Sequence, residues 1–184
     1  DASTLAMFGT GHQAEFEVAA VARVRELERI LVVGRSADRA EAFAARLREA
    51  GLECELSSPE AACRAADIIV TATTAREPLF QADWVQPGTH VSSMGSDAAG
   101  KQELPPDLFG RAALFCDLPE QSRRIGEFQH AAADLELTAI GEVLAGRVPG
   151  RRTPDDVTVF DSSGVSIQDL YIAREIIAAA GKDS

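Results

Sequence analysis

Short apolar runs alternate with stretches of helical periodicity along most of this chain. The runs are rich in Val, Ile and Leu and are bounded by glycine or polar residues, which is typical of strands covered on both faces of a sheet. They predict seven strands, at residues 5–8, 29–33, 53–56, 67–72, 88–94, 112–116 and 157–160.

Between several of these runs the apolar residues recur with helical spacing. One helix is predicted after the first strand, a second over residues 38–50, and a closing helix over residues 165–180. Ser58 and Pro59 can start a further helix, because serine caps well and proline fits the first helical position. Strands that alternate with helices indicate an α/β fold with a mainly parallel sheet.

The first predicted strand runs into a glycine turn that opens the first helix, with the sequence Gly9-Thr10-Gly11-His12-Gln13-Ala14. Gly9 can adopt the angles of a tight turn, Gly11 lets a pyrophosphate approach the backbone, and Ala14 lets the helix pack on the strand. The unpaired N–H groups at the helix start attract phosphates. This motif predicts a Rossmann-type, doubly wound, three-layer α/β/α fold that binds a dinucleotide. The alternative is a tight turn without a ligand.

The end of the second predicted strand favours NADP(H) over NAD(H). An acidic residue at this point accepts hydrogen bonds from the ribose 2′-hydroxyl of NAD, but here the position is Gly34. Arg35 follows and can pair with a 2′-phosphate, and Ser36 can add a hydrogen bond. We therefore expect NADP(H), with NAD(H) still allowed. The alternative is that Arg35 is an ordinary surface residue.

Composition and charge narrow the class of protein further. Hydrophobic residues make up 46% of the 184, which is typical of a globular core. The formal net charge of −11 argues against nucleic acid or an anionic membrane surface as partner. Cys54, Cys63 and Cys116 are widely spaced, so we expect reduced thiols in a cytoplasmic protein and no bound metal.

The start of the chain bears on the domain organisation. The first predicted strand starts almost at Asp1, so we expect residues 1–184 to be a dinucleotide-binding domain of a longer protein, without its substrate and dimerisation domain. A lone nucleotide-binding domain is the alternative.

The connection at residues 147–156 is expected to be exposed, with Arg151 and Arg152 either solvated or in contact with a phosphate.

A second polar loop follows the fifth predicted strand. Asp97 lies just past the carboxyl end of that strand, at the edge where open α/β sheets bind ligands. Gly95 and Gly100 suit close approach to a substrate. The alternative is that Asp97 caps the next helical turn.

Four stretches carry motifs that occur together in one family: residues 9–14, residues 71–74, the loop Gly95-Ser96-Asp97 with Gly100-Lys101-Gln102-Glu103-Leu104, and residues 159–169. The chain resembles the ornithine cyclodeaminase and mu-crystallin family in these stretches, and the Asp97 loop is the most specific of them. The match covers essentially the whole chain but only the nucleotide-binding domain of the family. Family members carry a further N-terminal part that forms a homodimer and supplies contacts to the substrate carboxylate.

The resemblance implies that Asp97 is the catalytic carboxylate, acting as acid and base at the amino or imino nitrogen. Hydride transfer comes from the cofactor, so the protein must place a proton donor near that nitrogen. The family's usual proline in this loop is Ala99 here, which lowers the rigidity of the loop. Besides Gly9, Thr10 and Gly11, the resemblance implies cofactor contacts from His12, Gln13, Thr73, Thr74, Val91, Ser93, Met94, Lys101 and Ser162. His90 and His130 have no such support and are expected to be structural or exposed.

Three functions stay open. The first is an NADP(H)-dependent oxidoreductase that reduces a cyclic imino acid or interconverts an α-amino and an α-keto acid. The second is a redox-neutral cyclodeaminase of the ornithine-to-proline type, and Arg35 counts against it because the family's cyclodeaminases favour NAD. The third is a non-enzymatic dinucleotide-binding protein, against which the intact Asp97 argues. A small amino or imino acid is the implied substrate, and residues 1–184 alone are expected to bind the dinucleotide without turnover.

Overall fold

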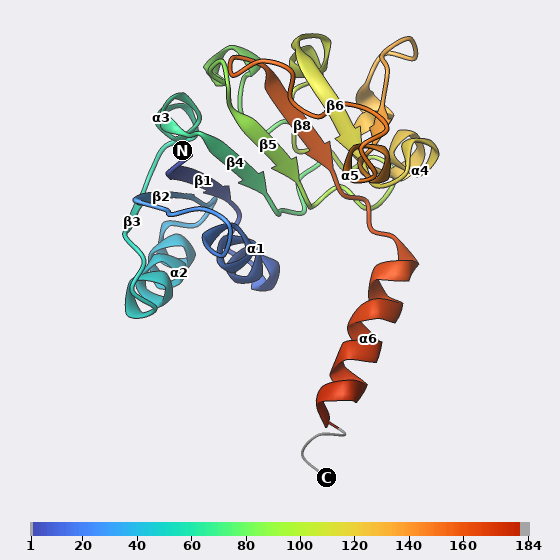
Figure 1. Ribbon diagram of the computed structural model, residues 1–184. Coiled ribbons are helices and arrows are strands. Elements are labelled where there is room, and N and C mark those ends of the chain that lie inside the picture. Colours follow the sequence, from blue (N-terminus) through green and yellow to red (C-terminus); the bar gives the residue numbers. More distant parts are fainter. Residues whose placement is uncertain (1, 181–184) are drawn as a thin grey trace.

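The computed structural model describes residues 2–180, and within them the chain forms one eight-stranded sheet flanked by helices (Figure 1). Every strand pair is parallel. The strands are β1 (Thr4–Phe8), β2 (Arg29–Val33), β3 (Cys54–Leu56), β4 (Ile68–Thr71), β5 (His90–Ser93), β6 (Ala112–Cys116), β7 (Thr138–Ala139) and β8 (Val157–Asp161). The α-helices are α1 (His12–Ala22), α2 (Ala37–Glu49), α3 (Pro59–Ala65), α4 (Pro119–Ile125), α5 (Ile140–Leu144) and α6 (Ser166–Ala180). Short 3-10 helices are η1 (Ala82–Trp84), η2 (Pro106–Arg111) and η3 (Glu127–His130).

The strand order is β3-β2-β1-β4-β5-β8-β6-β7. From β1 the chain moves outward through β2 and β3, and it then returns to place β4 on the other side of β1. This reversal is the switch point of a doubly wound sheet, and such sheets take ligands in the crevice outside the carboxyl ends of the strands there. The predicted Rossmann-type α/β fold is confirmed.

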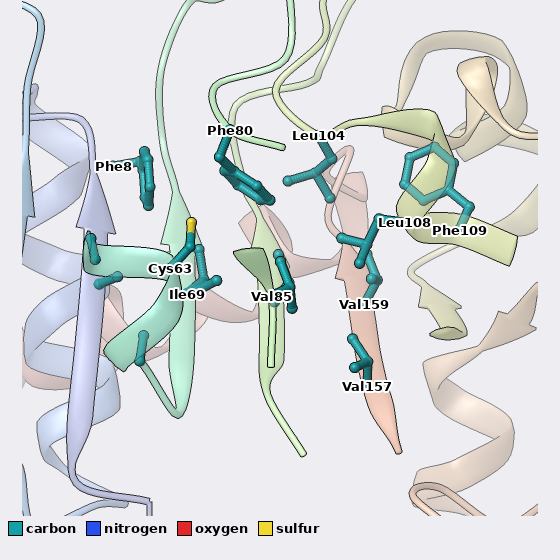
Figure 2. Close-up of a cluster of buried hydrophobic side chains, with 14 of the residues drawn as sticks. Phe8, Cys63, Ile69, Phe80, Val85, Leu104, Leu108, Phe109, Val157 and Val159 are labelled. Carbon is teal, nitrogen blue, oxygen red and sulfur yellow. The ribbon is translucent and has the colours of Figure 1, made fainter. Parts of the chain in front are cut away.

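Two apolar clusters cover the two faces of the sheet. Because successive strand residues point to opposite faces, Met7 of β1 packs with α1 and α2, whereas Phe8 packs in the cluster on the other face. That second cluster receives α3, η2 and η3. Figure 2 shows it running across the sheet through Phe8, Cys63, Ile69, Phe80, Val85, Leu104, Leu108, Phe109, Val157 and Val159. Helical layers on both faces give the expected three-layer arrangement.

The sequence pattern missed the short elements between β6 and β8. These are β7, α4 and α5, and runs as short as theirs carry no periodicity that separates them from loops. Tertiary pairing creates β7, where Thr138 lies opposite Phe115 of β6. The predicted third strand is found as β3, but it is an edge strand whose Glu55 and Leu56 are exposed.

The connection at residues 147–156 lies beside the amino ends of β5 and β8. Arg151 donates hydrogen bonds to the carbonyl oxygens of Gly88 (2.7 Å) and Pro154 (3.3 Å) and to Thr158 Oγ1 (3.2 Å). This edge is opposite the switch-point crevice, so Arg151 lies away from the glycine turn. Arg151 instead ties the exposed connection to the sheet.

Cys63 and Cys116 are buried, and Cys54 is half-buried. The three cysteines are free thiols, and burial raises the pKa of Cys63 and of Cys116 to about 12, which keeps both protonated. Among the residues that the structure describes, no cluster of His, Cys, Asp or Glu is arranged to hold a metal ion. No helix within residues 2–180 has both the length and the hydropathy needed to cross a membrane.

Helix α6 extends away from the sheet (Figure 1). The sequence predicted this closing helix. The large apolar side chains of the helix are all exposed: Ile167, Leu170, Tyr171, Ile172, Ile176 and Ile177. The stability of the sheet therefore does not depend on packing against α6.

Two leucines, one on α2 and one on α6, test whether α6 contributes to the stability of the domain. Leu47 on α2 is 3% exposed and Leu170 on α6 is 69% exposed. We expect Leu47→Ala to lower the free energy of unfolding by about 2–5 kcal/mol, because it leaves a cavity in the core. Leu170→Ala makes the same change at the surface and should alter it by less than about 0.5 kcal/mol. Urea unfolding followed by circular dichroism measures both, and equal losses would show that α6 packs on the domain in solution.

Candidate active site

The ends of the central strands lie in register along one edge of the sheet. Phe8 of β1 pairs with Val33 of β2 and Thr71 of β4, and Ser93 of β5 pairs with Thr71 and with Asp161 of β8. The residues that follow these strands therefore emerge side by side. They begin the segments that carry most of the predicted site residues: Gly9, Gly34, Ala72, Met94 and Ser162.

The glycine turn lies at the switch point. Gly9 has a φ of 112°, and a Cβ there would lie 3.0 Å from the carbonyl carbon of Ala72 and closer still to its oxygen, so both the turn and β4 require glycine. A Cβ on Gly11 would meet no atom within 4 Å, so the backbone there is open to a ligand. Gly11 starts α1 without a side-chain cap, whereas Ser36 caps α2 and Ser58 caps α3. Uncapped N–H groups beside an open glycine fit a pyrophosphate.

The polar residues of the turn are placed differently from one another. His12 is exposed, with its ring edge against Phe16 at a centroid distance of 5.2 Å. Gln13 is also exposed and donates to Glu17 on the next turn of α1, at 2.9 Å. Thr10 is half-buried beside Gly34. All three lie on the crevice edge, where a phosphate can reach the backbone as well as the side chains.

The segment after β2 combines packing with an available cation. A Cβ on Gly34 would lie 3.1 Å from both Ala40 Cβ and Thr10 Cγ2, so close packing favours glycine where an acidic residue would select NAD. Ser36 accepts a hydrogen bond from the backbone N–H of Arg39 at 3.4 Å, so it serves α2 as a cap. Arg35 is exposed, and within residues 2–180 no ion pair or hydrogen bond holds its guanidinium.

Asp97 lies in the exposed loop after β5. Its side chain is 61% exposed, and Lys101 Nζ lies 2.6 Å from Asp97 Oδ1 and also donates to the Gly95 carbonyl at 3.1 Å. The Lys101 side chain is only 19% exposed, so it reaches the carboxylate from beneath the loop. The sequence placed Lys101 near the cofactor without predicting this ion pair.

Beneath this edge lies a buried carboxylate that the sequence analysis did not single out. Glu103 is fully buried and accepts hydrogen bonds from the Thr71, Thr73 and Ser93 hydroxyls and from the backbone N–H groups of Thr73 and Gly95. Its residue number lay in a quoted motif, but a lone Glu in a polar loop carries no sign of burial. Only the fold shows that it joins the ends of two strands.

Two more acidic residues are buried next to Glu103. Glu127 accepts from the backbone N–H groups of Glu103 and Leu104, and Asp161 accepts from the Glu127 N–H and the Ser122 hydroxyl. Burial raises the pKa of Glu127 to about 7, against the lowering effect of the two backbone hydrogen bonds. Burial likewise raises the pKa of Asp161 to about 6, opposed by its bonds to Ser122 and Glu127.

Not every residue expected at the cofactor faces the crevice. The side chains of Val91 and Ser93 are fully buried, one in the core and the other on Glu103 and Glu127, so neither can line a nicotinamide. Their strand positions point them to the face away from α1, an alternation that the loop motif did not reveal.

The remaining expected contacts stay near the edge. Met94 is half-buried against the cluster beneath α1, and Thr74 is exposed. Thr73 is half-buried with its hydroxyl on Glu103, and Ser162 is half-buried with its hydroxyl on Asp117 at 2.9 Å. The hydroxyls and the backbone N–H groups of Thr73 and Ser162 are thus all engaged inside the protein.

The two unsupported histidines are structural. His90 lies within β5, with Nδ1 2.8 Å from Thr158 Oγ1 and Nε2 3.1 Å from Ser92 Oγ. Burial lowers the pKa of His90 to about 4, so it is neutral at physiological pH. His130 Nε2 lies 2.7 Å from the Lys101 carbonyl and steadies the base of the Asp97 loop.

A doubly wound parallel sheet with an open glycine turn at its switch point defines a dinucleotide-binding α/β domain. Residues 1–183 match the model of the ornithine cyclodeaminase/mu-crystallin family, and the chain belongs to this family. The iminosuccinate reductase of Paracoccus denitrificans is 37% identical over 184 residues, which are 97% of this chain and 57% of that protein.

Solved structures of similar proteins agree with this family assignment. An archaeal alanine dehydrogenase dimer with bound NAD superposes with a TM-score of 0.93 at 32% identity, over 100% of this chain and 59% of its own. A lysine cyclodeaminase, solved for its recognition of L-lysine, L-ornithine and L-2,4-diaminobutyric acid, gives a TM-score of 0.90 at 34% identity, over 100% of this chain and 55% of its own. The chain thus spans a little more than half the length of these proteins.

The raised pKa of Glu127 predicts a pH-dependent stability. The folded chain keeps a proton on Glu127 that the unfolded chain, with its ordinary pKa of 4.5, releases, so the free energy of unfolding should fall as pH rises from about 4.5 through 7. Asp161 adds a fall in the same direction at slightly lower pH. Glu127→Gln should flatten the dependence by an amount on the order of a few kcal/mol.

Urea titrations at several pH values measure this slope. Glu142, whose side chain is 44% exposed, is a suitable control, because Glu142→Gln removes a titrating group whose pKa is lowered, by its bond to Arg147, rather than raised. An unchanged slope in Glu127→Gln would show that Glu127 is ionised throughout the range.

Proposed function

We propose that this chain is the dinucleotide-binding part of an NADP(H)-dependent oxidoreductase that acts on a small amino or imino acid. Its reaction would be the reduction of a cyclic imino acid or the interconversion of an α-amino and an α-keto acid. The observation that carries the proposal is the register of the strand ends, which puts the glycine turn, Arg35 and the Asp97 loop along one edge. The full-length protein would be a homodimer that supplies the rest of the substrate site.

The order of segments along the edge fits an extended dinucleotide. Arg35 lies beyond β2, the glycine turn follows β1, and the Asp97 loop follows β5 on the other side of the switch point. A dinucleotide with its pyrophosphate on the N-terminus of α1 would have its adenosine ribose toward Arg35 and its nicotinamide toward Asp97. The bound cofactor supplies the hydride.

The residues of this chain then have separate tasks. Arg35 is free to hold a 2′-phosphate through two parallel hydrogen bonds. Asp97 would give a proton to, or take one from, the substrate nitrogen. Of the two Asp97 oxygens, Lys101 contacts Oδ1, so it would fix the carboxylate while the second oxygen faces the substrate. The open Gly11 backbone and the uncapped start of α1 would receive the pyrophosphate.

A redox-neutral cyclodeaminase is the second candidate. The similarity to a lysine cyclodeaminase, at a TM-score of 0.90, favours it about as much as the other comparisons favour a reductase. In that reaction hydride leaves the substrate and returns within one turnover, so the same Asp97 chemistry would serve. The two candidates separate in an assay of the full-length protein with L-ornithine and L-lysine, where only a cyclodeaminase forms a cyclic amino acid and ammonia without net reduction of the oxidised cofactor.

Arg35 should set the choice between the two dinucleotides. In fluorescence titrations we expect NADPH to bind more tightly than NADH, because only NADPH offers Arg35 a dianionic partner. Arg35→Ala should weaken NADPH binding by about 10- to 100-fold, the loss of hydrogen bonds to a charged group, and leave NADH binding nearly unchanged. Arg23→Ala is the charge-matched control, since the exposed Arg23 follows the last turn of α1 at the opposite edge. Equal affinities in the unmodified chain, or no selective loss for NADPH in Arg35→Ala, would contradict this role of Arg35.

Asp97 should be needed for turnover but not for dinucleotide binding. In the full-length protein, Asp97→Asn keeps size and polarity but cannot move a proton, so we expect kcat to fall by about 100- to 10,000-fold. NADPH affinity should be kept, because Asp97 lies across the switch point from the phosphate turn. Asp83→Asn, at an exposed carboxylate on η1, is the control. Near-normal turnover of a cyclic imine by Asp97→Asn would leave Asp97 as a loop residue only.

A further inference from the structure

The Glu103 carboxylate joins two segments that flank the candidate site. Its Oε1 accepts from the Thr73 backbone N–H (2.7 Å) and the Thr73 hydroxyl (2.7 Å). Its Oε2 accepts from the Gly95 N–H (2.9 Å), the Thr71 hydroxyl (2.8 Å) and the Ser93 hydroxyl (3.0 Å). Thr73 begins the turn after β4, and Gly95 begins the loop that carries Asp97.

The contact between Gly95 and Glu103 leaves no room for a side chain. A Cβ on Gly95 would lie 2.6 Å from Glu103 Oε1 and closer than that to the Thr73 carbonyl oxygen. The first residue of the Asp97 loop is therefore pressed against both the carboxylate and the Thr73 turn. Any shift of the carboxylate must move the loop, the turn or both, because interiors pack too closely to absorb it.

We propose that Glu103 is a positioning residue that fixes the Asp97 loop and the Thr73 turn relative to each other. Glu103 touches neither substrate nor cofactor, and its effect on turnover rests on the proposed function of Asp97. The carboxylate has this role because it accepts hydrogen bonds from the segments that follow two different strands. Lys101 sets the direction of the Asp97 side chain, whereas Glu103 sets the position of the backbone beneath it.

The replacement of Glu103 by glutamine tests the idea at constant shape. Each carboxylate oxygen accepts from one backbone N–H, and a backbone N–H cannot turn to become an acceptor. A glutamine NH2 group would therefore face either the Thr73 N–H or the Gly95 N–H, whichever way the amide is oriented. One of the two segments must lose its hydrogen bond and be released, and an unpaired buried donor is costly enough to move it.

Glu127 provides the matched control. It is a neighbouring, fully buried glutamate. The Glu103 N–H lies 3.1 Å from each of its two oxygens, and Oε1 accepts both from this N–H and from the Leu104 N–H at 2.7 Å. A glutamine oxygen can take that place and accept from both. Its NH2 group would then lie beside the Ser93 hydroxyl, which can accept as well as donate.

Amide hydrogen exchange on this chain measures the positioning directly. In Glu103→Gln we expect the amide of Thr73 or of Gly95 to exchange at least about tenfold faster, beyond any change at core amides such as that of Ile69. In Glu127→Gln both amides should keep their protection. If both amides stay as protected in Glu103→Gln as in the unmodified chain, the positioning role is overturned.

Steady-state kinetics of the full-length protein give the second measurement. We expect Glu103→Gln to lower kcat by about 100-fold, as a misplaced catalytic group does, and Glu127→Gln to stay within about threefold of the unmodified protein. A normal kcat in Glu103→Gln, in a protein that Asp97→Asn inactivates, would also overturn the proposal. If the unmodified protein shows no dinucleotide-dependent turnover while the amides respond as expected, the proposed function fails and the positioning role stands.

A second variant keeps the test valid if Glu103→Gln does not fold. Gly95→Ala keeps the Glu103 carboxylate and crowds its contact with the loop from the loop side. It should give faster exchange at the Gly95-side amides 95–97 and the same loss of kcat. Gly110→Ala is its control, because a Cβ at this exposed glycine would meet nothing within 4 Å. Normal exchange and normal kcat in Gly95→Ala would overturn the proposal.

Discussion

The alignment of parallel strand ends is the constraint on which the rest of this structure depends. Phe8, Thr71, Ser93 and Asp161 each end a strand and lie opposite one another in the hydrogen-bonded register. Parallel pairing carries every following loop to the same edge, and the return of the chain to β4 opens a crevice there. The glycine turn, Arg35 and the Asp97 loop thus become neighbours although they lie far apart in sequence.

The edge is held from within by buried acidic side chains. Glu103, Glu127 and Asp161 are fully buried, and the partners that hold them are backbone N–H groups and hydroxyls rather than cations. Hydrogen bonds of this kind offset the cost of burying a carboxylate, and they fix the loops in definite positions. Burial nevertheless raises the pKa of Glu127 and of Asp161 into a range where the pH of the cell matters. This cost of burial falls on the residues whose hydrogen bonds hold the loops in place.

The sequence predicted residues at the carboxyl edge of the sheet but not the buried acidic residues beneath that edge. The Gly9 turn could be predicted because a strand, a glycine turn and a helix follow in order, and each of those signals is local. Ser93 was misplaced because a one-residue alternation along β5 decides whether a side chain faces the crevice or the interior. Glu103 was overlooked as an anchor because its donors come from segments about 8 to 32 residues away.

The sequence by itself determined the fold class, the family and the segments of the candidate site, because strand hydrophobicity, glycine turns and short motifs are properties of neighbouring residues. The tertiary structure alone decided the strand order, the pairing that creates β7, the exposed course of α6 and the burial of Glu103. Those features arise from contacts between distant segments. Whether a carboxylate lies at the surface or accepts five hydrogen bonds in the interior depends on which strands meet above it, and no local pattern encodes that.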